Sequence, residues 1–283
     1  MLNRVMGMGD GSSGWRRASG QDAERAVRLA WLGGGVLLFL ASTAVTVTWC
    51  SVMGHMGAMA MPGGWSMSMM WMRMPGQSWP GAAAAFLGMW TMMMLAMMLP
   101  SFLPMAWRFR QAVCPSCPAR RRLGLIAVMG AGYLTVWALL GLVTFLAGVA
   151  LATCAMRQPA LARVVPIAVG MVVLSAGALQ FTAWKARHLA CCRAAPEDRR
   201  TLPADPGTAW RHGLRLGLHC CACCAGSTMV LLALGLMDLR VMAAVTAAIT
   251  LERLAPAGQR IARALGVVVV ACGVIVIART ACA

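Results

Sequence analysis

Residues 123–151 read LGLIAVMGAGYLTVWALLGLVTFLAGVAL, a run that contains no charged side chain. A helix of about 20 apolar residues is long enough to cross the ~30 Å hydrocarbon core of a membrane. No alternation of polar and apolar residues indicates the strands of a barrel. Further apolar runs lie at residues 29–52, 82–107, 161–184, 217–251 and 261–278. The sequence therefore predicts an all-α, polytopic helical membrane protein with about six transmembrane helices.

The composition supports this class and argues against several functions. Hydrophobic residues make up 60% of the 283 residues and charged residues only 12%, about half of what a soluble domain carries. The net charge of +17 would suggest a nucleic-acid partner in a soluble protein, but no nucleic-acid-binding motif accompanies it. The chain also lacks a phosphate-binding loop and a converging catalytic set. We expect a lipid bilayer as partner, no nucleic acid and no enzymatic activity.

The basic residues predict the orientation of the chain. With six spans, 17 of the 25 basic residues fall on the side of the termini and six on the other side. By the positive-inside rule, both termini lie in the cytoplasm, as expected for a multi-pass protein of a bacterial inner membrane. The chain then divides into a cytoplasmic segment (residues 1–28), a first transmembrane helix (29–52), an external Met/His-rich loop (53–81) and a helical metal-binding membrane core (82–283).

Residues 217–251 are the uncertain element of this division. As one helix they would measure roughly 52 Å, too long for an upright crossing. They either form one long helix that crosses from about Ala225, or break near Asp238 and Arg240 into two shorter pieces. A seven-span chain also satisfies the charge rule, but its extra span of about eleven residues is too short to cross.

Methionines are concentrated in two neighbouring segments. Glycine and proline interrupt residues 53–81, which predicts a loop there. In the next span, helical spacing places one row of methionines on one face and a second row beside it. Thioethers bind soft ions such as Cu(I), although methionine also fills gaps in apolar cores. The candidate ligands in the two segments are His55, Met56, Met59, Met89, Met93, Met94, Met97 and Met98.

Residues 217–224 read GLHCCACC and form the densest group of soft ligands in the chain. On a helix, His219, Cys220, Cys223 and Cys224 share one face, while Cys221 points away. We predict these four as metal ligands. A helix beginning near residue 217 would place them at its cytoplasmic end, level with the inner half of the Met-rich span. The two soft-ligand stretches are therefore expected to meet, with Arg211, Arg215 and the helix N-terminus favouring thiolates.

The remaining cysteines and charges carry weaker expectations. The pairs Cys114–Cys117 and Cys191–Cys192 fall in predicted cytoplasmic loops, where they either pass metal on or remain unpaired thiols. Glu252 with Arg253 reads as an interfacial pair. Isolated cysteines inside apolar segments are expected to be structural, and these are Cys50, Cys154, Cys272 and Cys282.

Four separated motifs, in order along the chain, carry a family resemblance. They are Trp90-x-x-Met93-x-x-Ala96-Met97-Met98-Leu99-Pro100-Ser101, Gly132-Tyr133-x-x-x-Trp137, Ala176-Gly177-x-x-Gln180-x-Thr182 and Arg211-His212-Gly213-x-x-x-Gly217-x-x-Cys220-x-x-Cys223-Cys224. With them, residues 82–278 resemble the DUF2182 family of predicted metal-binding integral membrane proteins, some described as copper chaperones. The resemblance implies a membrane protein that handles copper and singles out Cys220, Cys223 and Cys224.

Several functions fit these features. The first is a membrane protein that binds Cu(I) and delivers it, as a chaperone, to a copper-dependent membrane enzyme or a soluble copper carrier. A transporter of thiophilic metals such as mercury and an assembly subunit of a copper enzyme are alternatives. A thiol oxidoreductase is disfavoured, because its cysteine pairs would face the reducing cytoplasm.

Overall fold

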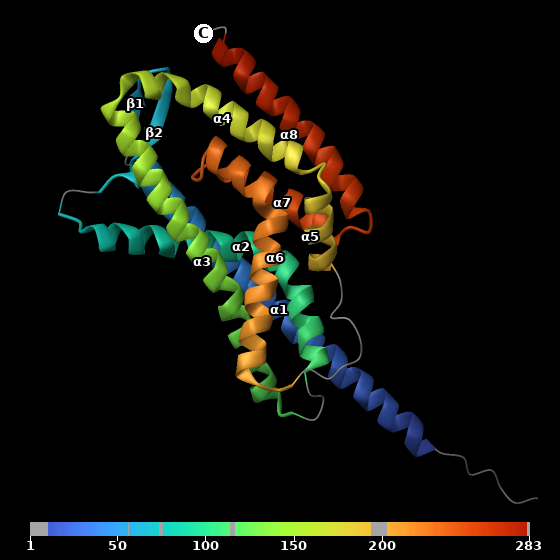
Figure 1. The fold of residues 1–283 in the computed structure, drawn as a ribbon. Coiled ribbons are helices and arrows are strands. Elements are labelled where there is room, and N and C mark those ends of the chain that lie inside the picture. Colours follow the sequence, from blue (N-terminus) through green and yellow to red (C-terminus); the bar gives the residue numbers. More distant parts are fainter. Residues whose placement is uncertain (1–10, 56, 74–75, 114–116, 194–202, 282–283) are drawn as a thin grey trace, which may run out of the picture.

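The computed structural model describes residues 11–55, 57–73, 76–113, 117–193 and 203–281. The described residues are almost entirely helical, which confirms the predicted class (Figure 1). The helices are α1 (Gly11–His55), α2 (Trp79–Ala112), α3 (Ala119–Arg157), α4 (Pro159–Leu179), α5 (Ala183–Arg193), α6 (Pro206–Leu234), α7 (Leu239–Leu254) and α8 (Gly258–Ala281).

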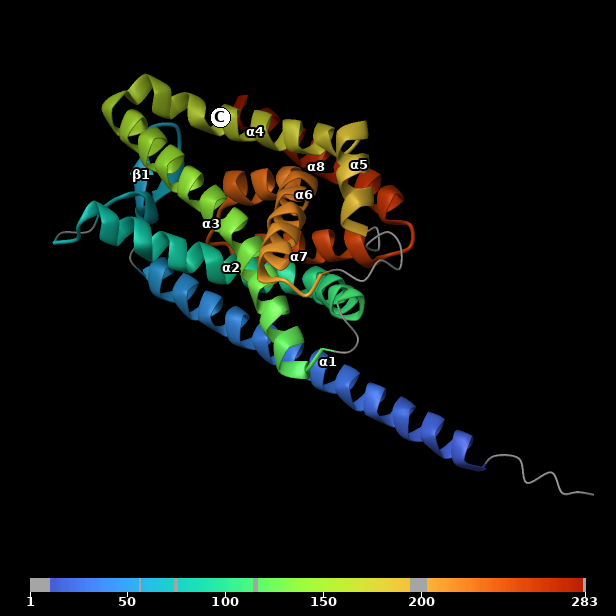
Figure 2. The same ribbon diagram turned by 60° about the horizontal axis from the view of Figure 1, so that its bottom comes forward.

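Six of these helices are long and apolar enough to cross a membrane, the number expected from the sequence. The candidate spans are Glu24–Met53, Trp79–Ala112, Ala119–Arg157, Pro159–Leu179, Pro206–Leu234 and Gly258–Thr280. Helix α1 begins well before its apolar run, and its first turns project beyond the other helices in both views (Figures 1 and 2).

The long element at residues 217–251 breaks into two helices, as one of the two alternatives predicted. Helix α6 ends at Leu234, and the residue that caps it, Gly235, has a φ of 134°, which favours glycine. Three residues later, the Asp238 carboxylate accepts hydrogen bonds from the backbone N–H groups of Arg240 and Val241 and caps α7. The Asp238 side chain therefore stabilises the start of α7 at the break between the two helices.

The predicted start of the cysteine-bearing helix near residue 217 is wrong. Helix α6 begins at Pro206, and the Asp205 carboxylate accepts from the backbone N–H of Thr208 at 2.9 Å. An aspartate N-cap followed by proline is a strong start signal. Cys220 consequently lies about half way along α6 rather than at its end.

The Met-rich segment also contains more regular structure than the predicted loop. Strand β1 (Ala58–Met61) pairs antiparallel with β2 (Trp65–Ser68), and the short 3₁₀ helix η1 (Met69–Trp71) follows. Gly63 and Gly64 have φ values of 99° and 74°, so the glycines form a hairpin turn instead of preventing pairing. Trp65 Nε1 donates to the Ala162 carbonyl oxygen at 2.8 Å, which fixes the hairpin against α4.

Close helix contacts position the site. Helix α6 packs along α3, and α4 packs along α8. At the first of these interfaces, a Cβ added to Gly132 would lie 2.7 Å from the Trp210 carbonyl oxygen, and one at Gly213 would overlap the Met129 carbonyl. Only glycine permits this approach of the two backbones. It brings the middle of α3 against the cysteines of α6.

Candidate metal centre

Three thiols from one face of α6 form the centre. The Sγ atoms of Cys220, Cys223 and Cys224 lie within 4.8 Å of one another, with 3.6 Å between the last two and 4.0 Å between the outer pair. Each residue is at most 1% exposed. The i, i+3, i+4 spacing brings the side chains together, as the sequence predicted. Cys221 is half-buried and stands apart from this group.

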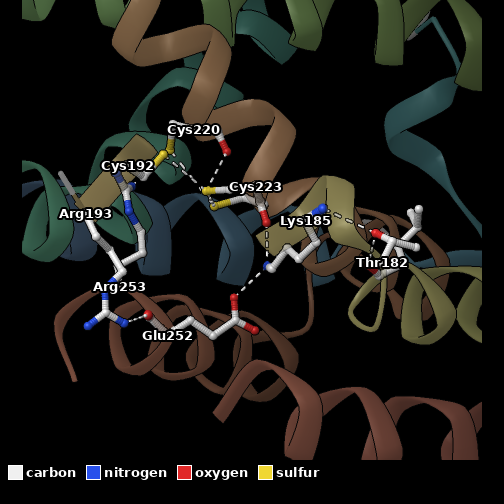
Figure 3. A network of polar contacts seen from close by, with 10 residues as sticks. Thr182, Lys185, Cys192, Arg193, Cys220, Cys223, Glu252 and Arg253 are labelled. Atoms are coloured by element: carbon white, nitrogen blue, oxygen red, sulfur yellow. Dashed lines mark hydrogen bonds and ion pairs between the residues drawn. The ribbon is translucent and has the colours of Figure 1, made fainter. Parts of the chain in front are cut away.

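A fourth thiol comes from α5. The Sγ atom of Cys192 lies 3.5 Å from that of Cys223, and Cys192 is 3% exposed (Figure 3). The sequence placed it in a loop, whereas it occupies the last turn of a short helix packed on α6. Its hydrogen bond to Cys223, together with burial, raises the pKa of the Cys192 thiol. Cys192 is therefore suited to remain protonated and to donate to Cys223.

A thioether from α2 meets the thiols. Met98 Sδ lies 3.8 Å from Cys220 Sγ, so the two soft-ligand stretches come into contact as expected. Met93, Met94 and Met97 are buried in the same core, each at most 3% exposed. Met89 lies nearer the start of α2, where it lines a separate pocket.

A buried guanidinium contacts the first cysteine. Arg253 Nη1 donates to Cys220 Sγ at 3.1 Å and to Ser101 Oγ at 2.9 Å, and Arg253 is 7% exposed. The Tyr133 hydroxyl lies 3.0 Å from the same sulfur. A positive charge beside a sulfur favours the thiolate. Arg253 thus fills the role predicted for Arg211 and Arg215, which are both exposed.

A buried ion pair lies on the other side of the thiols. Lys185 Nζ contacts Glu252 Oε2 at 2.6 Å and also donates to the Cys223 carbonyl oxygen (Figure 3). Burial raises the pKa of Glu252, and the Lys185 ammonium opposes that shift. The predicted interfacial Glu252–Arg253 pair is wrong: both residues are buried, and each has its own partner.

The structure does not bring His219 to the thiols. Its Nδ1 lies 3.2 Å from Nδ1 of His188 on α5, and the His188 ring meets Trp184 edge-on. A residue next to Cys220 is rotated by about 100° around the helix, which turns this imidazole toward α5.

Of the predicted ligands in the external segment, the structure describes the side chain of Met59 alone. Met56 lies outside the described residues, as do Cys114 and Cys282. His55 is the last residue of α1, and Met59 is exposed on β1. Of the cysteines expected to be structural, Cys154 and Cys272 are exposed, whereas Cys50 is buried.

A buried group of thiols with a thioether beside it is a donor set for soft metal ions, with Cu(I) foremost. Residues 87–276 match the PpoB2 family, described as copper chaperones. The chain belongs to the PpoB2 family. The matched segment spans the whole centre, from Met98 to Arg253, so the family's copper-handling role and the observed thiol group agree. No curated protein and no solved structure matches the chain.

Residues missed by the sequence reasoning complete the PpoB2-family centre: Lys185, Cys192, Tyr133, Glu252 and Arg253. Four of these residues had sequence features that pointed in part to a functional role. Cys192 belonged to a cysteine doublet, Glu252 and Arg253 were a charged pair between apolar runs, and Tyr133 belonged to a family motif. Which of these side chains face the thiols depends on the packing of α3, α5 and α7 around α6.

Proposed function

We propose that this PpoB2-family protein is a membrane chaperone that holds one Cu(I) ion on Cys220, Cys223 and Cys224 and delivers it to a copper-dependent enzyme or carrier. The observation that carries the proposal is the buried thiol group with a guanidinium against one sulfur. Thiolates bind Cu(I) tightly, and burial protects the ion from water and oxidants. Met98 supplies a neutral fourth donor at the edge of the group.

The buried charges around the thiols determine how many thiolates each metal ion needs. Among the residues that the structure describes, the charged side chains buried around the thiols are Lys185, Glu252 and Arg253, which leave one positive charge in excess. An unbalanced buried charge is costly, and one thiolate balances it. Bound Cu(I) adds one positive charge, so two thiolates bring the net charge of the centre to zero. A divalent soft ion such as Hg(II) needs a third thiolate for the same balance.

We further propose that the six candidate spans lie in a bacterial inner membrane with both termini in the cytoplasm. The uneven distribution of basic residues supports this orientation. In this arrangement, the Met-rich hairpin faces the outside, and the thiol centre lies within the membrane part of the protein. Because the centre is buried, copper leaves it by ligand exchange with a partner rather than by free diffusion.

The test is Cu(I) binding by the purified full-length protein in competition with a chromophoric Cu(I) chelator. We expect one tight Cu(I) per chain and sulfur-only coordination in X-ray absorption. Because outer-shell changes alone cost about 10- to 100-fold in metal affinity, replacing two ligands in C220S/C223S should cost at least about 100-fold.

The matched control is C154S/C272S, which removes two exposed thiols from α3 and α8 and should bind as the unmodified protein does. Unchanged Cu(I) affinity in C220S/C223S would contradict the proposed centre. Tight Hg(II) binding together with weak Cu(I) binding would instead favour the heavy-metal transporter.

A further inference from the structure

A second group of methionines lines a pocket beside α2 and the 3₁₀ helix η1, which follows the hairpin. The pocket has a volume of about 90 Å³ and lies between α1, η1, α2 and the turn that joins α6 to α7. Six of its lining residues are methionines: Met53, Met69, Met70, Met72, Met89 and Met237. Met89 is buried and the other five are half-buried, so the methionines lie around a space that opens at the surface.

We infer that this pocket is a second Cu(I) site, built from thioethers alone, which loads the thiol centre. The inference deepens the proposed function and rests on it. None of the described residues that line it carries a charge. A thioether needs no deprotonation and carries no charge, so the site accepts a soft monovalent cation without counter-ions. Cations that require oxygen ligands, such as Ca²⁺ and Mg²⁺, find no suitable donor set here.

The pocket is an assembled feature rather than a consequence of one Met-rich stretch. Its methionines come from α1, from η1 and the residue after it, from α2, and from the turn at Met237. At this edge, Cys50 Sγ lies 3.7 Å from Met237 Sδ. Methionines that only filled a core would leave no such space between them. The convergence of four segments on one space favours a ligand.

Buried methionines follow one another along α2 between the pocket and the thiol centre. Met89 lines the pocket and begins the helical row that continues through Met93 and Met97. The adjacent row ends at Met98, whose sulfur contacts Cys220. Nine residues of helix separate Met89 from Met98, about 14 Å at 1.5 Å per residue. Between the pocket and the centre, the ligands therefore change from neutral thioethers, which bind Cu(I) weakly, to anionic thiolates, which bind it strongly.

The first experiment measures how fast limiting Cu(I) reaches the thiol centre in the full-length protein. The variant M53L/M70L/M237L removes three pocket sulfurs from three segments while nearly conserving side-chain volume. We expect loading to slow by at least about tenfold, with the final affinity of the thiol centre unchanged. The unchanged affinity also shows that the variant is folded.

The control M92L/M156L/M171L replaces three exposed methionines that do not line the pocket, and it should load at the normal rate. Equal loading rates in the pocket variant and the control would overturn the inference.

The second experiment separates this inference from the proposed function. In the C220S/C223S background, one weak Cu(I) equivalent should remain, with thioether sulfur as its coordination. Adding M53L/M70L/M237L should abolish it, and adding the control substitutions should not. A weak equivalent that survives the pocket substitutions would refute the pocket. Absence of tight Cu(I) binding by the unmodified protein would instead refute the thiol centre.

Discussion

The thiol centre and the methionine pocket are both rich in sulfur, but their surroundings differ. The centre is almost fully excluded from solvent and has Arg253, Lys185 and Glu252 around it. The pocket opens between half-buried methionines, and no described residue in its lining is charged. Thiolates carry charge that must be balanced when buried, whereas thioethers do not. A thiolate site therefore needs several helices to supply partners, while a thioether site can be assembled beside a short hairpin.

The family match covers the thiol centre and the methionine pocket to different extents. Residues 87–276 include every side chain described at the thiol centre. Only Met89 and Met237 of the pocket methionines fall within that match, and the others come from α1 and the segment around η1. The pocket thus combines elements of the family's core with the segment that precedes it.

The largest effect should come from breaking the ion pair that supports the centre. E252Q leaves the Lys185 ammonium buried without its carboxylate, which should cost about 3–5 kcal/mol in the free energy of unfolding. Thermal unfolding in detergent measures the loss. The double variant K185M/E252M removes both charges and should recover most of the stability. If E252Q were as stable as the unmodified protein, the buried Lys185 ammonium would need no carboxylate partner.

A smaller effect, on copper rather than on stability, should follow the loss of the guanidinium. R253M removes a charge-assisted hydrogen bond to Cys220, worth about 1.5–3 kcal/mol. The Cu(I) affinity of the thiol centre should fall by about 10- to 100-fold in chelator competition. R215M removes an exposed arginine from α6 and should leave the affinity unchanged. If the weak pocket equivalent fell as well, the electrostatic distinction between the two regions would be wrong.

The sequence predicted those features that depend on local pattern. A membrane-spanning helix forms its backbone hydrogen bonds within itself, so an apolar run is enough to identify it. The number of candidate spans, six, could therefore be predicted from the sequence. Helical spacing likewise placed Cys220, Cys223 and Cys224 on one face. The same pattern grouped His219 with them, although its side chain turns to His188.

Features that depend on tertiary packing were not predictable in this way. Cys192 and Arg253 reach the thiols only because α5 and α7 pack on α6 and α2. The hairpin was missed because glycine signals both loops and tight turns, and only the pairing of Met61 with Trp65 distinguishes the two. The predicted helix start failed because the Asp205–Pro206 cap precedes a stretch with several polar residues.

The smallest effect tests whether a neutral donor at the thiol centre matters at all. The Tyr133 hydroxyl lies 3.0 Å from Cys220 Sγ, and its ring packs on Phe102 with 4.9 Å between the centroids. Y133F keeps the ring and removes the hydroxyl, so the loss should be that of one hydrogen bond, about 1 kcal/mol. Chelator competition should then show Cu(I) affinity about fivefold lower, with unfolding nearly unchanged.

If Y133F lowered the Cu(I) affinity as much as R253M does, hydrogen bonding and not charge would determine how tightly the thiol centre binds Cu(I). The contrast with the uncharged methionine pocket would then rest on burial alone. A small effect beside a large one for R253M would instead leave the buried positive charge as the property that separates the two sulfur-rich regions.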